Sequence, residues 1–120
     1  LGFSNLISDL SLEWKDVIQE CKELKNLDIV SSGRIPPDSI RLLNSQRFKD
    51  LIKEISSEKK YDTIIFDTPP ILGLSDSLLI SEFCDGIILL VSCDYIDRRL
   101  AYEAYERIIN SKTTLLGMIG

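Results

Sequence analysis

Two short runs of the chain are apolar without a polar residue at every second position, and they limit the fold more than any other feature. Thr63 to Phe66 and Ile87 to Ser92 lack the alternation expected of a strand with one solvated face. Continuous apolar strands are typical of parallel sheets covered on both faces. Stretches with helical periodicity separate them, so the sequence predicts a three-layer α/β fold, a mostly parallel sheet flanked by helices.

The remaining elements are predicted from apolar spacing and from residues that favour helix starts. Phe3 to Leu10 has the spacing of a short helix, and Trp14 to Cys21 that of a second one. Leu27 to Val30 and Thr114 to Ile119 are expected to be strands. Three further helices are expected: a long one that begins near Asp38 or Ser39 and carries Phe48, Leu51, Ile52 and Ile55, a short one capped by Ser75 or Asp76, and one that begins after Asp97.

The charge and the residue types argue against several classes of function. Fourteen basic and nineteen acidic residues give a net charge of −5, which disfavours nonspecific binding to nucleic acid. The chain has no histidine, so a Ser-His-Asp triad and histidine-containing zinc sites are excluded. Cys21, Cys84 and Cys93 form no C-x-x-C pair, and we expect reduced thiols, with Cys84 and Cys93 buried as packing residues. No apolar run is long enough to span a bilayer.

The expected strand 63–66 ends on an acidic residue, Asp67, followed by Thr68, Pro69 and Pro70. The carboxyl ends of strands in an open parallel sheet face the ligand crevice, and a carboxylate there needs a cation or a hydrogen-bond donor. Hydrated Mg²⁺ is one such partner. Four apolar residues followed by Asp are also the pattern of a Walker B strand, whose acid holds the metal of a bound nucleotide. Alternatively, Asp67 accepts hydrogen bonds from the following turn, and the pattern alone leaves both interpretations open.

The phosphate-binding loop that normally accompanies such an acid is absent from the sequence. The motif G-x-x-x-x-G-K-[ST] needs its glycines so that backbone amides can wrap phosphates. Lys112 and Thr113 supply its last two residues, but Ser111 and Glu106 stand at the two glycine positions. The chain also begins without a methionine and ends within an apolar segment. We therefore expect a piece of a longer protein with an incomplete sheet.

Three collinear stretches resemble the bacterial tyrosine kinases, which belong to the deviant-Walker branch of P-loop proteins together with the ParA/MinD-type ATPases. YDTIIFDTPPILGLSDSLLISEFCDGIILLVS, residues 61–92, resembles the Walker B region of these kinases. NLDIVSSGRIPPDSIRLLNSQRFKDLI, residues 26–52, resembles a loop and helix that plain partitioning ATPases lack. LGFSNLISDL, residues 1–10, resembles the stretch after the second Walker motif. Asp38-Ser39 departs from the usual Asn-Pro, and Ser31-Ser32 from Pro-Ala.

This resemblance implies that residues 1–120 are the C-terminal part of a P-loop ATPase or tyrosine kinase domain whose Walker A and second Walker motifs lie outside the chain. It implies Mg²⁺ and ATP as cofactors of the intact parent, although neither is expected to bind to the piece alone. Asp67 would coordinate Mg²⁺ directly or through water, and Thr68 and Pro69 would shape the loop beside it. Residues 94–99 would lie near the nucleotide. Within them, Arg98 and Arg99 are expected first of all to be surface charges at the start of a helix.

The implied function is that of an ATP-dependent protein tyrosine autokinase that regulates capsular or exopolysaccharide biosynthesis and export. The implied partners are neighbouring kinase subunits and a membrane polysaccharide co-polymerase segment, with no nucleic acid. The implied location is a cytoplasmic domain at the inner face of the cell membrane. The family's phosphorylated tyrosines lie outside this chain, so Tyr95, Tyr102 and Tyr105 are not expected to be acceptors. The alternatives are a ParA/MinD-like partitioning or positioning ATPase and a non-catalytic assembly domain.

Overall fold

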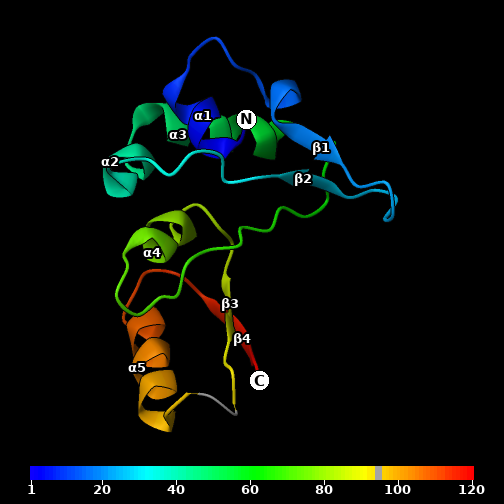
Figure 1. Cartoon of the computed structure of the whole chain (residues 1–120). Coiled ribbons are helices and arrows are strands. Elements are labelled where there is room, and N and C mark those ends of the chain that lie inside the picture. Colours follow the sequence, from blue (N-terminus) through cyan, green and yellow to red (C-terminus); the bar gives the residue numbers. More distant parts are fainter. Residues whose placement is uncertain (94–95) are drawn as a thin grey trace. The chain divides into compact units, whose positions relative to one another are not determined.

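The computed structural model describes residues 1–93 and 96–120, which divide into two compact units, Leu1–Lys59 and Lys60–Gly120 (Figure 1). The first unit holds four helical segments and a two-stranded sheet: α1 (Phe3–Ser8), the 3₁₀ turn η1 (Trp14–Asp16), β1 (Ile18–Glu20), β2 (Asp28–Val30), α2 (Ser39–Leu43) and α3 (Gln46–Ser57). The second unit holds two helices and two strands: α4 (Asp76–Ser81), β3 (Ile87–Leu90), α5 (Arg98–Ile109) and β4 (Leu115–Ile119).

Strands β1 and β2 form an antiparallel hairpin in which Ile18 lies opposite Val30 and Glu20 opposite Asp28. Strand β2 confirms the strand expected over Leu27 to Val30. The prediction of a second helix over Trp14 to Cys21 is wrong. Only the single turn η1 is helical, and the chain then extends into β1. Pairing with β2 satisfies the backbone groups of β1, and the β-branched Ile18 favours an extended chain.

The long helix expected after Asp38 is two helices, because the chain breaks at Asn44 and Ser45. As expected, the Asp38 side chain caps α2, accepting a hydrogen bond of 2.9 Å from the Arg41 amide. Ser45 begins α3 in the same way, since its Oγ accepts a hydrogen bond of 3.1 Å from the Phe48 amide. The expected apolar face of α3 is confirmed by four buried side chains, Phe48, Leu51, Ile52 and Ile55.

Changing Ser45 to alanine should destabilise the chain by about 1 kcal/mol, because the capping acceptor of the first turn of α3 is lost. Urea unfolding followed by circular dichroism measures the loss. Ser56 is the matched control, since it lies exposed inside the same helix. Ser56→Ala should leave stability unchanged or slightly raised, because alanine favours a helix interior more than serine does. An equal loss in both variants would show that Ser45 contributes nothing as a cap.

In the second unit, β3 and β4 pair in parallel, with Ile87 opposite Leu115 and Leu90 opposite Ile119. This pairing confirms both expected strands and their parallel direction. Helix α5 lies between them in the sequence and begins at its expected cap, because Asp97 accepts a hydrogen bond from the Arg99 amide. The cluster at the centre of the unit joins α5 and β3 to the segment before α4, through Ala104, Ile108, Leu89 and Ile71.

The strand expected over Thr63 to Phe66 is not a strand in this structure. Its backbone pairs with none of the described strands, and the chain runs through residues 62–70 without regular structure (Figure 1). Ile65 is 86% exposed, so the run is not buried as expected. A strand exists only where a neighbouring strand takes its amides and carbonyls, and no described strand pairs with this segment. The described sheets are two pairs of strands, and the three-layer parallel architecture remains a prediction.

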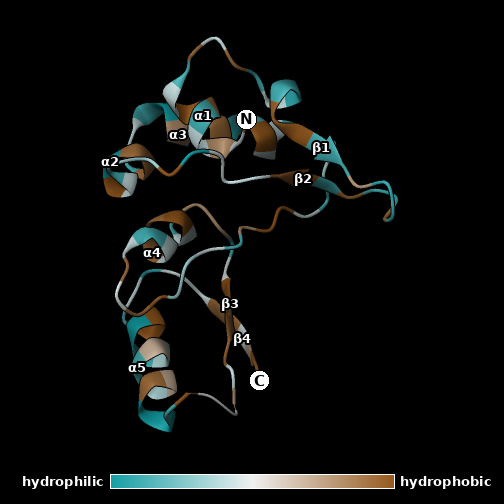
Figure 2. Ribbon diagram, in the orientation of Figure 1, coloured by the Kyte–Doolittle hydropathy of each residue, from teal (hydrophilic) through white to brown (hydrophobic). Residues whose placement is uncertain are grey.

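Figure 2 shows why local pattern alone suggests strands in the second unit. Both β3 and β4 are strongly apolar, and the irregular segment that leads to α4 contains an apolar stretch with paler and hydrophilic stretches around it (Figure 2). One side of β3 carries Leu89, which is buried in the cluster, whereas Ile88 and Leu90 on its other side are 56% and 72% exposed. The pair of strands therefore has one packed face and one apolar face open to solvent.

Candidate functional site

The acidic residue that the sequence singles out lies on the irregular segment before α4. Asp67 is exposed, Thr68 is half-buried, and Pro69 is exposed. Two anchors hold the chain just beyond them. The Ser77 hydroxyl donates a hydrogen bond of 2.6 Å to the Pro69 carbonyl, and Ile71 is buried in the apolar cluster. The loop is therefore fixed on the side that faces α4 and α5, and Asp67 lies at its open end.

The Asp67 carboxylate has no hydrogen bond or ion pair within residues 1–93 and 96–120. The alternative in which Asp67 accepts hydrogen bonds from the turn that follows is therefore not observed. The Pro69 and Pro70 positions could not donate such bonds in any case, because proline has no amide hydrogen. An exposed carboxylate without a partner is available to a cation or to a donor from another molecule.

The oxygen ligands near Asp67 could hold Mg²⁺ only if water and a bound phosphate supplied its remaining ligands. Within the described part of the chain, no group of three or more His, Cys, Asp or Glu residues is placed to hold a metal ion. Mg²⁺ does not need such a cage, because it usually keeps several waters and binds one or two carboxylates together with the phosphates of its substrate. One free carboxylate followed by the Thr68 hydroxyl fits that mode of binding.

The other residues near the expected nucleotide side fall into two groups. Asp94 and Tyr95, for which the sequence predicts a position near the nucleotide, lie outside the described residues. Arg98 and Arg99 are exposed, as expected of surface charges, and the Arg99 guanidinium pairs with Asp97 at 3.0 Å. That contact holds the pKa of the Asp97 carboxyl below its usual value, through hydrogen bonds from the Arg99 side chain and amide.

Lys112 and Thr113 do not form part of a phosphate loop in this structure. The Thr113 hydroxyl lies 2.9 Å from the buried Ser81 hydroxyl, so this pair links the end of α4 to the residues before β4. The contact gives Thr113 a packing role within the unit. It agrees with the absence of the motif's glycines in the sequence.

Tyr102 and Tyr105 lie one helical turn apart on α5, with ring centroids separated by 6.2 Å. Tyr105 packs against the central cluster, as its spacing predicts. Tyr102 is 61% exposed, and its hydrogen bond with Glu106 raises the pKa of its phenol. Neither contact indicates a phosphate acceptor.

The cysteines are free thiols, in agreement with the expected absence of disulfides. Cys84 is half-buried, and burial, aided by nearby Asp85, raises the pKa of its thiol, so the reactive thiolate is disfavoured. Cys93 was expected to be a buried packing residue, but it is exposed. It follows β3 after the packed part of that strand has ended, so the apolar run before it does not cover it.

Ser77 is the positioning residue that the sequence pattern did not reveal. Its side chain is 8% exposed, and its hydroxyl reaches back over eight residues to the Pro69 carbonyl. A polar residue in the first turn of a short helix usually indicates a cap, so nothing in the local pattern signals this longer contact. Burial of a hydroxyl requires such a partner, and only the folded chain identifies it.

Comparisons with known proteins agree on one family. The chain is 37% identical to the tyrosine-protein kinase YwqD of Bacillus subtilis over 116 residues, which are 97% of this chain and 47% of that protein. It is 34% identical to the tyrosine-protein kinase CpsD of Streptococcus agalactiae over 118 residues, which are 98% of this chain and 49% of that protein. The chain belongs to the bacterial tyrosine kinase family. It spans about half the length of these curated relatives.

The fold leads to the same family. The solved kinase domain of VpsO superposes with a TM-score of 0.87 at 25% sequence identity, and the match covers 98% of this chain and 56% of that one. No family model matches the sequence. Among the helices formed by the described residues of this bacterial tyrosine kinase homologue, none has both the length and the apolar character needed to cross a membrane.

Proposed function

We propose that this chain is part of an ATP-dependent protein tyrosine autokinase that regulates capsular or exopolysaccharide biosynthesis and export. Similarity along nearly the whole chain to proteins named as tyrosine-protein kinases carries the proposal. The segment Asp67-Thr68-Pro69-Pro70 supports it, since it presents a free carboxylate on an anchored loop. The alternatives, a partitioning ATPase or a non-catalytic assembly domain, have no comparable support.

Within this proposal Asp67 is the ligand of the Mg²⁺ that accompanies ATP. Bound Mg²⁺ would neutralise phosphate charge and align the nucleotide for transfer. Thr68 and Pro69 would set the position of the carboxylate, and the hydrogen bond from Ser77 would keep the loop from moving as the cation binds. The groups that wrap the phosphates would come from residues outside this 120-residue chain, because its sequence has no Walker A motif.

The proposed partners follow from the family and the reaction. A tyrosine of a neighbouring kinase subunit would accept the phosphate, and a membrane polysaccharide co-polymerase segment would hold the kinase at the inner face of the cell membrane. Nucleic acid is not a proposed partner, since the chain carries a net charge of −5.

The 120-residue chain alone should transfer no phosphate to tyrosine, because it lacks the glycine-rich loop that binds phosphates. The test incubates the purified chain with Mg²⁺ and γ-labelled ATP and measures labelled phosphotyrosine. A protein of the relatives' length that contains the chain is the positive control. Tyrosine phosphorylation by the isolated chain would contradict the proposal that residues outside it supply the phosphate-binding groups. Release of phosphate without phosphotyrosine by the longer protein would favour the partitioning ATPase instead.

A further inference from the structure

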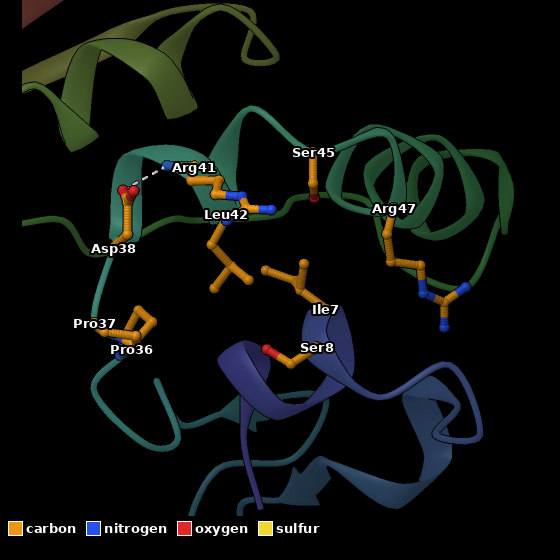
Figure 3. Close-up of a pocket in the computed structure, with 9 residues that line it drawn as sticks. All are labelled: Ile7, Ser8, Pro36, Pro37, Asp38, Arg41, Leu42, Ser45 and Arg47. Atoms are coloured by element: carbon orange, nitrogen blue, oxygen red, sulfur yellow. Dashed lines mark hydrogen bonds between the residues drawn. The ribbon is translucent and has the colours of Figure 1, made fainter.

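A pocket of about 340 Å³ lies in the first unit, between the C-terminal end of α1, the Pro36-Pro37 segment and the start of α2 and α3 (Figure 3). Its apolar walls are the side chains of Ile7 and Leu42 and the two proline rings. Backbone contacts fix these walls, because the Phe3 and Ser4 amides donate to the Ser31 and Ser32 carbonyls at 2.8 and 2.9 Å. Proline adds rigidity, since its ring locks the backbone.

Three polar side chains that line this pocket each make a hydrogen bond within the chain. The Asp38 carboxylate accepts from the Arg41 amide, and the Ser45 hydroxyl accepts from the Phe48 amide. The Ser8 hydroxyl donates to the Ser4 carbonyl at 2.8 Å. The second oxygen of the Asp38 carboxylate takes no hydrogen bond within the described residues, so an anionic ligand would bind on the Arg41 and Arg47 side of the pocket.

Apart from Asp38, the charged side chains that line the pocket are two arginines, Arg41 and Arg47. Within the described part of the chain, the Arg41 guanidinium has no hydrogen-bond or ion-pair partner. In Figure 3 its side chain extends past Leu42 toward Ser45. Arg47 also lines the pocket, and one of its amino nitrogens, Nη2, donates to the Leu12 carbonyl at 3.1 Å. Its Nε is buried and has no partner among the described residues.

We propose that this pocket binds the side chain of a phosphotyrosine, with the ring against the apolar walls and the phosphate on Arg41. A guanidinium presents paired donors that match phosphate geometry, and Arg41 is free to do so. A volume of about 340 Å³ lies at the lower end of small-molecule sites, which suits one aromatic side chain better than a larger ligand. Arg47 adds a second positive charge to the pocket lining.

The proposal rests on the proposed function in one respect: phosphotyrosine is the product that a tyrosine autokinase would supply. A docking site for that product would retain a phosphorylated segment of a neighbouring subunit beside the kinase. The binding itself needs no phosphate transfer. Failure of the docking proposal can therefore be told apart from failure of the kinase proposal.

The test uses the isotope-labelled 120-residue chain and N-acetyl-phosphotyrosine amide, followed by nuclear magnetic resonance titration. We expect amide shifts concentrated at residues 7–8 and 36–47. Three further probes resolve the chemistry: inorganic phosphate, N-acetyl-phosphoserine amide and N-acetyl-tyrosine amide. Binding of the phosphotyrosine probe should be at least ~10-fold tighter than that of each other probe, because only it carries both the ring and the phosphate.

Arg41→Gln should weaken binding of the phosphotyrosine probe by about 10-fold or more, and Arg41→Lys by less, since lysine keeps the charge without the paired donors. The control is Lys53→Gln, which removes an exposed positive charge on α3 outside the pocket lining and should bind the probe as the parent chain does. Equal binding by the parent and Arg41→Gln would overturn the proposal. So would equal affinity for the phosphoserine probe, or shifts that map outside the pocket.

Discussion

Changing Asp67 to asparagine should lower Mg²⁺-dependent phosphate transfer to tyrosine by about 100-fold or more, in a protein of the relatives' length that contains this chain. Asparagine keeps the size of the side chain but removes the negative charge that would hold the cation. Losing one preorganised electrostatic contact commonly costs ~10²–10³-fold in rate. Labelled phosphotyrosine formed at saturating ATP, over a range of Mg²⁺ concentrations, measures the effect. Higher Mg²⁺ should restore part of the activity.

The same change should leave folding stability unaltered, because Asp67 is exposed and its carboxylate has no hydrogen bond or ion pair to a described residue. Asp62 supplies the matched control: it is exposed, lies five residues earlier on the same segment, and is not expected to touch the nucleotide. Asp62→Asn should retain full activity. If both variants lose activity equally, or if Asp67→Asn turns over normally, Asp67 is not the metal ligand.

Elements that are determined by interactions between residues close in the sequence were predicted well. Helix α5 follows from its cap at Asp97 and from Ala104 and Ile108 at helical spacing, and both features act within a few residues. Strands β3 and β4 follow from continuous apolar runs bounded by polar residues. Their parallel pairing was expected because helix α5 connects them, and a parallel crossover needs such a connection.

Elements that depend on distant partners were predicted poorly. Trp14 to Cys21 has apolar residues at helical spacing, yet Ile18 to Glu20 extends because β2 pairs with it. The break before α3 has a local signal that was missed: Ser45 is a good N-cap, and it stands three residues before the buried Phe48. Periodicity continued across Asn44 and Ser45 and so hid the boundary.

The candidate site also has features that the local sequence predicts and features that only long-range packing sets. The identity of Asp67 and the stiff prolines that follow it could be read from the sequence. Its surroundings could not, because the neighbours of residues 63–66 and the contact of Ser77 with Pro69 are set by long-range packing. The resemblance to bacterial tyrosine kinases identified the family correctly, since it drew on three collinear stretches rather than on one acidic residue.

The second large effect should come from Ile108, whose side chain is fully buried in the cluster that anchors the Asp67 loop. Ile108→Ala should cost about 2–5 kcal/mol of stability, because it removes three buried carbons and leaves a cavity beside Ile71 and Leu89. A unit of this size has only a few kcal/mol of stability in total, so much of it would be lost. Urea unfolding gives the size of the loss, and amide hydrogen exchange of β3 and β4 locates it.

Ile109 provides a control of identical chemistry on the adjacent residue, because its side chain is 52% exposed on the same helix. Ile109→Ala should change stability by no more than about 0.5 kcal/mol, as is usual for exposed positions. The comparison separates burial from helix propensity, which alanine improves equally at both positions. Faster exchange near residues 69–71 in Ile108→Ala alone would show that the cluster holds the loop. Equal losses in the two variants would show that it does not.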